Sequence, residues 1–408
     1  MSLRSCDAPA NEPAPMRVAD ALALIRGRLP VSAGVERVVL GNAPGRILAE
    51  DVVAPLSLPP FDNSAVDGYA FRLDDGMSGL LPVAARVPAG APVPAVPPGS
   101  AVRIFTGAPL PPGADTVAMQ EDVRVEGGAV RLPGGLARGA NCRREGEDVK
   151  AGSLALPAGR RLGARDIALA AALGLRELPV RHRLRVGLFS TGDEVTATGD
   201  GLAPSGIHDA NGPMLAALLA RWGAVPLPLG ILRDDPVNVR ERLAEAASGC
   251  DVIVTSGGVS VGEEDHVRAA VGQAGGIALW RLAIKPGRPL AFGDVAGTPF
   301  VGLPGNPSAA YVTALAILLP VLSQLGGGAE EAPLPLVRSG FTMTKRLGRR
   351  EYLRVCLRPG DDGLSVASLA PNGALFGLAA SDGFAELHED CEAIRPGDLL
   401  PFRAHPLG

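Results

Sequence analysis

Residues 181–327 alternate between short apolar runs and amphipathic runs, and this alternation constrains the fold more than any other feature of the chain. The pattern predicts strands and helices in turn. The strands are expected at residues 184–190, 251–255, 279–284, 289–292 and 299–303, and the helices at residues 213–222, 236–247 and 308–319. Such alternation is typical of a doubly wound, mostly parallel sheet with helices on both faces. Ligands of these sheets bind beyond the carboxyl ends of the strands, so we expect the site in the loops that follow them.

The loop after the predicted strand 251–255 carries the strongest chemical signal. The chain passes from an apolar run through Ser256, Gly257, Gly258 and Ser260 into a cluster of acidic residues that ends at Asp265. Glycines allow the backbone to approach a ligand, bared N–H groups can face an anion, and carboxylates can hold the cation that accompanies a phosphate. The sequence therefore predicts an anion-binding loop with a cation beside it.

Two further loops follow predicted strands. Ser190-Thr191-Gly192-Asp193-Glu194 offers hydroxyls, a glycine and carboxylates, although an acidic turn would have the same composition. Leu303-Pro304-Gly305-Asn306-Pro307-Ser308 leads into an apolar helix, and Pro307 suits the first helical turn, whose free N–H groups would face the loop. A well-capped junction between a strand and a helix is the alternative interpretation of this second loop.

The bend Ile284-Lys285-Pro286-Gly287-Arg288-Pro289 places two cations between two apolar runs. The proline rings fix the backbone φ angles, so that both cations can be directed at one place. Two cations in this arrangement suit a dianionic oxyanion such as molybdate, sulfate or phosphate. The alternative is a turn with solvated charges.

The length of 408 residues exceeds what one hydrophobic core usually serves, so several domains are expected. Residues 1–15 are expected to be a disordered lead without the apolar core of a signal peptide. Residues 16–180 form an N-terminal region, in which 16–55 and 140–180 flank a β-domain inserted at about 56–139. Residues 181–327 form the central α/β domain. Residues 335–408 alternate between Val- and Leu-rich runs and turns, which predicts a small all-β domain.

Charge and cysteine content exclude several classes of protein. The net charge of −4 and the absence of a basic stripe argue against a nucleic-acid partner. Five widely separated cysteines without C-x-x-C spacing predict neither a disulfide framework nor a zinc site and favour a cytoplasmic location. The most apolar run, residues 309–322, is judged too short to span a bilayer, so a buried helix and no membrane partner are expected.

Residues 258–262 also match G-x-S-x-G, the nucleophile elbow of serine hydrolases. A remote alternative is therefore a hydrolase with Ser260 as nucleophile. An elbow needs a tight turn where a strand meets a helix, but here the apolar run stops at Thr255 and acidic residues follow Gly262. The histidine of a triad would have to be His388 or His405, both in the C-terminal all-β domain.

Taken together, the motifs closely resemble those of the molybdopterin molybdenumtransferases, the molybdenum-insertion enzymes to which the E domain of gephyrin also belongs. The resemblance extends from about Val18 to near the C-terminus. In the order of the family, the matching segments are residues 62–70 (DNSAVDGYA), 105–108 (FTGA), 146–148 (GED), 190–194 (STGDE), 255–260 (TSGGVS), 285–287 (KPG) and 304–307 (PGNP).

The resemblance implies a multidomain α/β homodimer. Each subunit would have a split N-terminal part with the inserted β-domain, the central doubly wound domain and a C-terminal β-barrel. In the family's reaction, adenylylated molybdopterin and molybdate yield molybdenum cofactor and AMP with the help of Mg²⁺. The molybdopterin adenylyltransferase is a further possible partner.

The resemblance also assigns roles to residues. The pterin phosphate or adenylate would be held by Ser256, Gly257, Gly258 and Ser260, and molybdate by Lys285 and Arg288 with Ser308 nearby. Asp265 and Glu194 are the metal candidates. The full catalytic set would be Asp67, Thr106, Asp148, Glu194, Asp265, Lys285 and Arg288, with the first three contributed by the N-terminal part. Further substrate-binding candidates are Asp209, Asp235, Pro304, Asn306, Ser308, Arg349 and Arg354.

Three positions depart from the family pattern, all on the oxyanion side. Arg288 stands where lysine is usual, Ala309 where serine is frequent, and Phe376-Gly377 where a serine pair is common. A planar guanidinium is not a point charge, so molybdate geometry could shift. The alternative function is a non-catalytic dimeric scaffold or a diverged paralogue that binds molybdopterin. The joint presence of acidic and cationic loops favours the enzyme.

Overall fold

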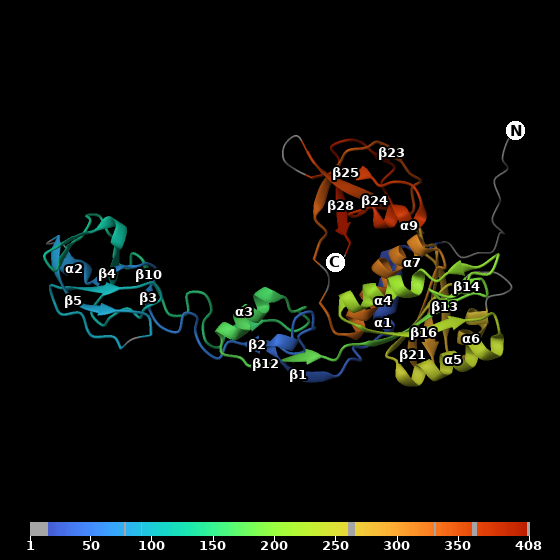
Figure 1. The fold of residues 1–408 in the computed structure, drawn as a ribbon, viewed down its shortest axis with the longest axis horizontal. Coiled ribbons are helices and arrows are strands. Elements are labelled where there is room, and N and C mark those ends of the chain that lie inside the picture. The colour runs from blue at the N-terminus through green and yellow to red at the C-terminus, as the bar shows by residue number, and fades with distance from the viewer. Residues whose placement is uncertain are drawn as a thin grey trace. The chain divides into compact units, whose positions relative to one another are not determined.

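The structure is a computed structural model that describes residues 15–76, 79–90, 92–259, 266–329, 332–360 and 365–405. The chain forms two compact units (Figure 1). The large unit comprises Met1–Glu36, Gly45–Ile47 and Val180–Gly408, and the small unit comprises Arg37–Pro44 and Leu48–Pro179. The expected disordered lead, apart from Pro15, and the loop residues 260–265 lie outside the described residues.

The large unit is built on a six-stranded sheet. Its strand order is β16 (Val225–Leu232), β13 (Arg185–Thr191), β17 (Val252–Ser256), β21 (Thr298–Leu303), β20 (Pro289–Val295) and β18 (Ile277–Arg281). The first four strands are parallel, and β20 and β18 are antiparallel to their neighbours. The predicted mostly parallel sheet is therefore confirmed. Strand β16 was not predicted, because Pro226, Pro228 and Gly230 interrupt its pattern; prolines are tolerated there because β16 is an edge strand.

Helices cover both faces of this sheet, as the alternation predicted. One face packs against α4 (Asn211–Trp222), α1 (Val18–Arg28) and the continuous helix formed by α7 (Pro307–Thr313), η3 (Ala314–Leu318) and α8 (Leu319–Leu325). The other face packs against α5 (Pro236–Gly249) and α6 (His266–Ala274). Alternate residues of β17 serve the two cores: Val252 and Val254 pack on the first face and Ile253 on the second.

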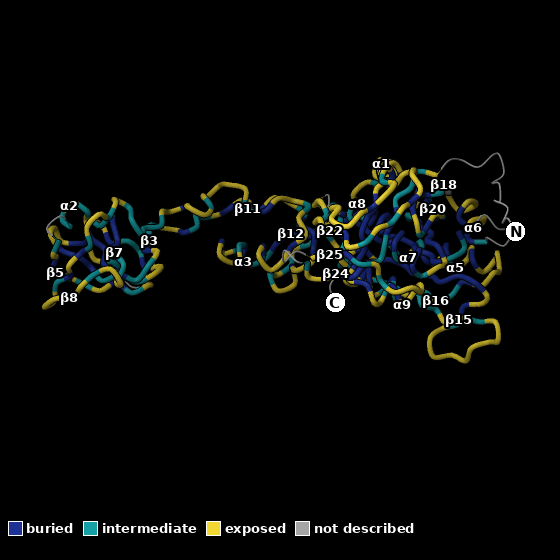
Figure 2. The backbone as a smooth tube through the Cα atoms, turned by 90° about the horizontal axis from the view of Figure 1, so that it is seen from above, coloured by how far each residue is buried: buried dark blue, intermediate teal, exposed yellow. Residues whose placement is uncertain are grey.

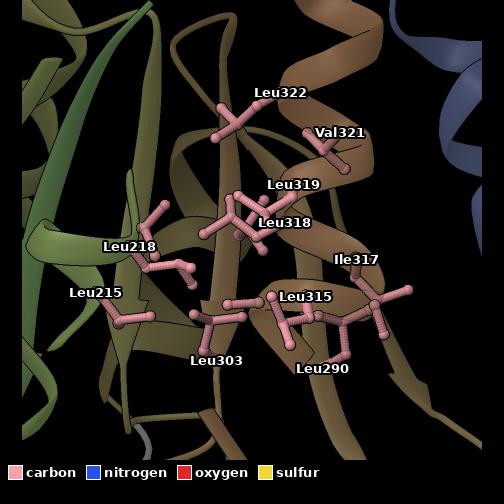
Figure 3. Close-up of a cluster of buried hydrophobic side chains, with 14 of the residues drawn as sticks. Leu215, Leu218, Leu290, Leu303, Leu315, Ile317, Leu318, Leu319, Val321 and Leu322 are labelled. Carbon is pink, nitrogen blue, oxygen red and sulfur yellow. The ribbon is translucent and has the colours of Figure 1, made fainter. Parts of the chain in front are cut away.

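The first of these cores is formed largely by leucines (Figure 3). In the close-up, Leu215 and Leu218 of α4 face Leu315, Leu318 and Leu319 of the long apolar helix, with Leu303 of β21 between the elements. In Figure 2 the sheet strands and these helices are mainly dark blue, whereas the loop beside β15 (Ile207–His208) is yellow.

The helix Pro307–Leu325 corrects one prediction. It has 19 residues and a mean hydropathy of 1.7, so by length and composition alone it could cross a bilayer. The expectation that the apolar run was too short for this is wrong, because the helix extends beyond residues 309–322 at both ends. The expectation of a buried helix is confirmed, since 72% of the span is buried inside the protein.

The C-terminal part of the large unit is a closed barrel of five strands (Figure 1). The order is β24 (Arg350–Pro359), β25 (Ser365–Leu369), β22 (Leu336–Ser339), β28 (Leu399–Ala404) and β26 (Gly383–Leu387), which pairs again with β24. The implied β-barrel is thus confirmed. Helix α9 (Ala374–Ala379) and a short pair, β23 (Met343–Thr344) with β27 (Ala393–Ile394), complete it. Strand β19 (Ile284–Lys285) adds to β24 in parallel, so Lys285 is fixed at the edge of the barrel.

The small unit contains a six-stranded sheet. Its order is β7 (Thr116–Met119), β4 (Gly68–Phe71), β6 (Ala101–Ile104), β5 (Leu80–Val87), β9 (Ala129–Arg131) and β8 (Arg124–Glu126). Short pairs join β3 (Asn63–Ser64) to β10 (Cys142–Arg143) and β2 (Val52–Val53) to β11 (Leu154–Leu156). The remaining elements of the described residues are α2 (Leu73–Gly76), α3 (Ala164–Ala172), η1 (Leu40–Asn42), η2 (Gln120–Asp122), β1 (Val35–Val39), β12 (Glu177–Arg181) and β14 (Val195–Thr196), which pairs with β15.

Candidate active site

A pocket of about 340 Å³ lies at the carboxyl ends of the parallel strands in the large unit. Its lining comes from the ends of β13 and β17, from the loop between β15 and α4, from the loop after β16, and from the loop between β21 and α7. Of the predicted residues, the structure brings Glu194, Asp209, Ser256, Gly257 and Gly258 together in this lining.

The backbone of the loop after β17 strongly favours glycine at two positions. Gly257 has φ +97° and Gly258 has φ +66°, both in the left-handed region. A Cβ on Gly257 would lie 2.3 Å from Thr191 Oγ1, and one on Gly258 would lie 2.7 Å from Val267 Cγ2. Both glycines therefore let the loop pass close to β13 and α6 while their backbone borders the pocket.

Asn211, the first residue of α4, holds three pocket loops together. Its Nδ2 donates to Ser256 Oγ at 2.7 Å and to the carbonyl of Gly305 at 2.7 Å. Ser256 Oγ in turn donates to the carbonyl of Pro304 at 3.3 Å. A carbonyl can only accept, so the contact with Gly305 fixes the orientation of the amide. The opposite atom, Asn211 Oδ1, is buried without a hydrogen-bond partner.

Asn211 was not among the site residues predicted from the sequence. The helix was expected to begin at residue 213, which left Asn211 in a loop, whereas α4 begins at Asn211 itself. The available signal was a polar residue directly before the Gly-Pro start of an apolar helix, two residues after Asp209.

Carboxylates also line the pocket. Asp209 accepts from Ser190 Oγ at 2.8 Å and from the backbone N–H of Gly212 at 2.9 Å. Glu194 and Asp234 also line the pocket, and both are exposed. The sequence pattern predicted Asp209 and Glu194 as site residues. It did not predict Asp234, because the neighbouring Asp235 was the candidate.

Arg233 fixes the loop that carries Glu194. Its Nη1 donates to the carbonyls of Gly192, Asp193 and Val195 at 3.2, 3.0 and 2.9 Å. The backbone N–H of Asp234 adds a bond of 3.1 Å to Asp193 Oδ1. The loops after β13 and β16 are therefore tied to each other, although no sequence motif connects them.

Two predicted residues serve mainly as helix caps. Asp235 Oδ1 accepts from the N–H groups of Val237 and Asn238 at the start of α5, and Asn306 Oδ1 accepts from Ala309 at the start of α7. Neither side chain is among those that line the pocket. Pro304 takes part through its carbonyl, as the acceptor of Ser256.

The pocket offers hard oxygen donors for a cation. Among the described residues, no group of three or more His, Cys, Asp or Glu is arranged to hold a metal. Mg²⁺, however, is usually bound by one or two carboxylates together with substrate phosphates and water. Glu194 and Asp234 are two such carboxylates, so this donor set fits Mg²⁺. The other metal candidate, Asp265, lies outside the described residues.

Two of the predicted residues, Lys285 and Arg349, meet at a buried carboxylate. Glu351 is 1% exposed; its Oε2 lies 3.4 Å from Lys285 Nζ and its Oε1 lies 2.6 Å from Arg349 Nη2. The single negative charge of Glu351 thus faces the positive charges of both Lys285 and Arg349. These three side chains together keep a net positive charge. The Lys285 side chain is 55% exposed, so it retains N–H donors for an anion. Arg288 is exposed, and the structure gives its side chain no ion pair with any described residue.

Ser308 and Arg354 donate to the same backbone carbonyl, that of Ala374. Ser308 Oγ donates to the carbonyl of Ala374 at 2.8 Å, and Arg354 Nη1 donates to the same carbonyl at 2.9 Å. A Cβ on Gly377 would lie 2.3 Å from the carbonyl oxygen of Pro371 and 2.7 Å from Arg354 Nη1. This packing leaves no room for a side chain at position 377.

Helix α7 lies between these two groups of predicted residues. Its first residue, Pro307, lines the pocket, and Ser308 reaches the Arg354 segment. One turn further, Thr313 Oγ1 is 3.5 Å from the carbonyl of Gly287, in the loop that carries Lys285 and Arg288. The Gly-rich pocket and the cationic groups therefore flank one helix.

In the small unit, the structure pairs Asp67 with Thr106. Asp67 Oδ1 accepts from the backbone N–H of Thr106 at 2.8 Å and from its hydroxyl at 2.7 Å. These two bonds, the backbone one first, lower the pKa of Asp67 below its usual value. The carboxylate is therefore held in its charged form.

The two charge-rich segments of the small unit also meet. Asp62 accepts from the backbone N–H of Glu145 at 2.8 Å and from Arg144 Nη1 at 2.5 Å. The bond from Glu145 is the main cause of the lowered pKa of Asp62. Asp148 pairs with Arg143 at 2.7 Å. The β3–β10 pairing brings these segments together.

The arrangement does not support a serine hydrolase. Strand β17 ends at Ser256, before the G-x-S-x-G match, and Ser260 lies outside the described residues. His405 is bonded to Tyr311 and Ser381, and His388 contacts Arg350. Neither histidine lines the pocket.

Three family models match the chain in succession. They describe the MoeA N-terminal region (domain I and II) at residues 16–174, a probable molybdopterin binding domain at residues 187–324, and the MoeA C-terminal region (domain IV) at residues 337–403. The pocket lining falls within the second match.

Curated relatives and solved structures agree with these matches. The molybdopterin molybdenumtransferase of Haemophilus influenzae is 40% identical over 392 residues, which are 93% of this chain and 97% of the relative. Molybdopterin molybdenumtransferase 2 of Mycobacterium tuberculosis is 38% identical, with 89% and 93% covered. The structure of the molybdopterin biosynthesis moeA protein from Pyrococcus horikoshii OT3 is 29% identical, with 96% and 100% covered and a TM-score of 0.80. The chain belongs to the molybdopterin molybdenumtransferase family.

Proposed function

We propose that the protein transfers molybdate into adenylylated molybdopterin and releases AMP and molybdenum cofactor. Family membership makes the chain an enzyme of molybdenum cofactor biosynthesis with a molybdopterin substrate. The finer reaction rests on one observation above all: a glycine-lined pocket and a set of cationic groups flank the same helix, α7.

The pocket suits the phosphates of the substrate. The left-handed glycines at 257 and 258 bring backbone close to the pocket. The first turn of α7 adds free N–H groups and a partial positive charge. Asn211 keeps Ser256 and the loop before α7 in place, so that these donors need little rearrangement when an anion arrives.

The cationic groups suit molybdate. Lys285 is held at the barrel edge by its pairing with β24, and its ammonium is only partly neutralised by Glu351. Arg288 lies three residues further along the same bend and carries a second exposed positive charge. Together they would hold the oxyanion beside the substrate.

A divalent cation is part of the proposal. Glu194 and Asp234 would hold Mg²⁺ in the pocket, with Asp265 as a further candidate. When bound, Mg²⁺ would neutralise charge on the phosphate oxygens of the scissile bond. The protein itself fixes the loop that carries Glu194, because Arg233 donates hydrogen bonds to the carbonyls of Gly192 and Val195 on either side of it.

The family resemblance supports the remaining parts of the proposal. These are a homodimer, roles for Asp67, Thr106 and Asp148 in the reaction, contact with the molybdopterin adenylyltransferase, and a cytoplasmic location. In the small unit, the bonded pair Asp67 and Thr106 supplies a fixed carboxylate that such a role would require.

An AMP-release assay tests the proposal. Purified protein given adenylylated molybdopterin, Mg²⁺ and molybdate should release AMP, and Lys285→Ala should abolish the dependence on molybdate while nucleotide binding persists. Arg395→Ala, which removes an exposed cation elsewhere on the barrel, is the matched control. If the unmodified protein releases no AMP, the non-catalytic scaffold or diverged paralogue becomes the better description.

A further inference from the structure

Three neighbouring strands of the small unit place two arginines and a tyrosine in register. Tyr69 of β4 lies opposite Arg103 of β6, and Arg103 lies opposite Arg86 of β5. Phe105 follows Arg103 by two residues, the spacing that returns a side chain to the same face.

These side chains form a stacked row, which we call the arginine ladder (Arg86, Phe105, Arg103, Tyr69). The guanidinium carbon of Arg86 lies 4.6 Å from the centroid of the Phe105 ring. That of Arg103 lies 4.8 Å from the Phe105 centroid and 5.0 Å from the Tyr69 centroid. All three contacts are within the range of cation–π interaction.

No described carboxylate forms an ion pair with the ladder, although the charge of Arg103 contributes to the lowered pKa of Asp67. Arg103 is held by neutral acceptors, the carbonyl of Gly68 at 3.0 Å and the side-chain oxygen of Gln120. Arg86 is exposed, and no described residue forms an ion pair with it. Two like charges beside one ring repel each other, so the ladder would gain from an anion placed between or beside the guanidinium groups.

We propose that the arginine ladder binds a planar heterocycle that carries a phosphate, in the chemical class of adenosine 5′-monophosphate. A guanidinium stacked on a ring keeps its N–H fork directed outward, where it matches the geometry of a phosphate. The outer face of the Arg86 guanidinium is available for stacking by a base. The choice of the adenylate rests on the proposed function, in which the substrate carries AMP.

The ladder is also preorganised for this role. Stacking restrains two long side chains that would otherwise lose conformational freedom when a ligand arrives. Thr106 follows the ladder residue Phe105 directly, and it holds Asp67 in its charged form. The ladder would therefore fix an anion beside a carboxylate that the family resemblance assigns to the reaction.

Photolabelling of the full-length protein with 8-azido-AMP locates the site directly. The label should appear in the tryptic peptides 47–72 and 104–124, which carry Tyr69 and Phe105. Excess AMP should compete, whereas adenosine, which lacks the phosphate, should compete at least tenfold less well. Arg86→Gln should lower the labelling of these peptides about tenfold, as expected for the loss of one charge-assisted hydrogen bond.

Arg131→Gln is the matched control, because Arg131 is an exposed arginine of the same unit that pairs with Glu126 at 3.1 Å. It should leave the labelling unchanged, and both variants should keep the Tm of the unmodified protein. Equal labelling of Arg86→Gln and the unmodified protein would overturn the inference. Labelling confined to the pocket peptide 243–268 would also overturn it but would leave the proposed function intact. Labelling of the ladder without AMP release would reject the proposed reaction and retain the nucleotide site.

Discussion

Asn211 donates a hydrogen bond of 2.7 Å to Ser256, although 45 residues separate the two in the chain. The same amide group donates to the carbonyl of Gly305, which lies 94 residues from Asn211 in the chain. One side chain therefore joins the start of α4 to the end of β17 and to the loop that follows β21. Its position at the start of α4 is fixed by the leucine core beneath it, where Leu215 and Leu218 pack against the long apolar helix.

Asn211→Asp should loosen the pocket. The substitution replaces an N–H donor by a carboxylate oxygen that would face the carbonyl of Gly305, so two acceptors would oppose each other in a buried site. We expect a loss of about 2 kcal/mol in the free energy of unfolding and a larger fall in AMP release. Urea denaturation and the AMP assay measure the two effects. Asn238→Asp, the same chemical change in the first turn of α5, should change stability by less than about 0.5 kcal/mol.

Gly257→Ala should disrupt the pocket through steric contact as well as through its backbone conformation. The new Cβ would lie 2.3 Å from Thr191 Oγ1. Gly199→Ala separates the two effects, since Gly199 has nearly the same φ, +98°, and open space around it. Thermal unfolding should show a cost of about 1 kcal/mol for Gly199→Ala and at least twice that for Gly257→Ala. Equal costs would contradict the claim that the loop needs close packing.

Thr106→Val should raise the pKa of Asp67 towards its ordinary value of 3.8, because one of the two bonds that lower it is lost. A lowered carboxyl pKa stabilises the folded state above the unfolded pKa, and this contribution is lost as the pH falls through the folded pKa. The variant should therefore show a smaller decline in stability below pH 3.8. A carboxyl titration followed by NMR gives the pKa directly, and an unchanged value would refute the contribution of the Thr106 hydroxyl, since the backbone bond is kept in the variant.

His405 should make the large unit sensitive to mild acid. Burial lowers its pKa below the ordinary 6.5, and its two ring nitrogens are bonded to Tyr311 and Ser381. As the pH falls below 6.5, the unfolded chain takes up a proton before the folded one does, so stability declines until the folded pKa is passed. His405→Gln should flatten this decline, as measured by denaturant unfolding between pH 7 and pH 5. A decline of the same size in the variant would assign the effect to other groups.

The sequence was most informative where local pattern and global fold agree. The alternation from residue 181 onward predicted the sheet and its helices, since apolar periodicity reflects which faces are buried. Edge strand β16 was not predicted, because its prolines and glycine are typical of a loop. Strand β28 was also not predicted, although the family resemblance implied the barrel that this strand completes.

The sequence by itself determined the family, the sheet and the glycine positions at 257 and 258, because these depend on periodicity and on backbone conformations that only certain residues adopt. Tertiary structure alone decided what the polar side chains do. It made Asp235 and Asn306 helix caps, assigned Arg233 and Asn211 to the pocket, and placed Gly377 against Arg354. The physical reason is that a hydrogen bond depends on a few ångströms and an angle between groups far apart in the chain, and residue types and their spacing do not encode that geometry.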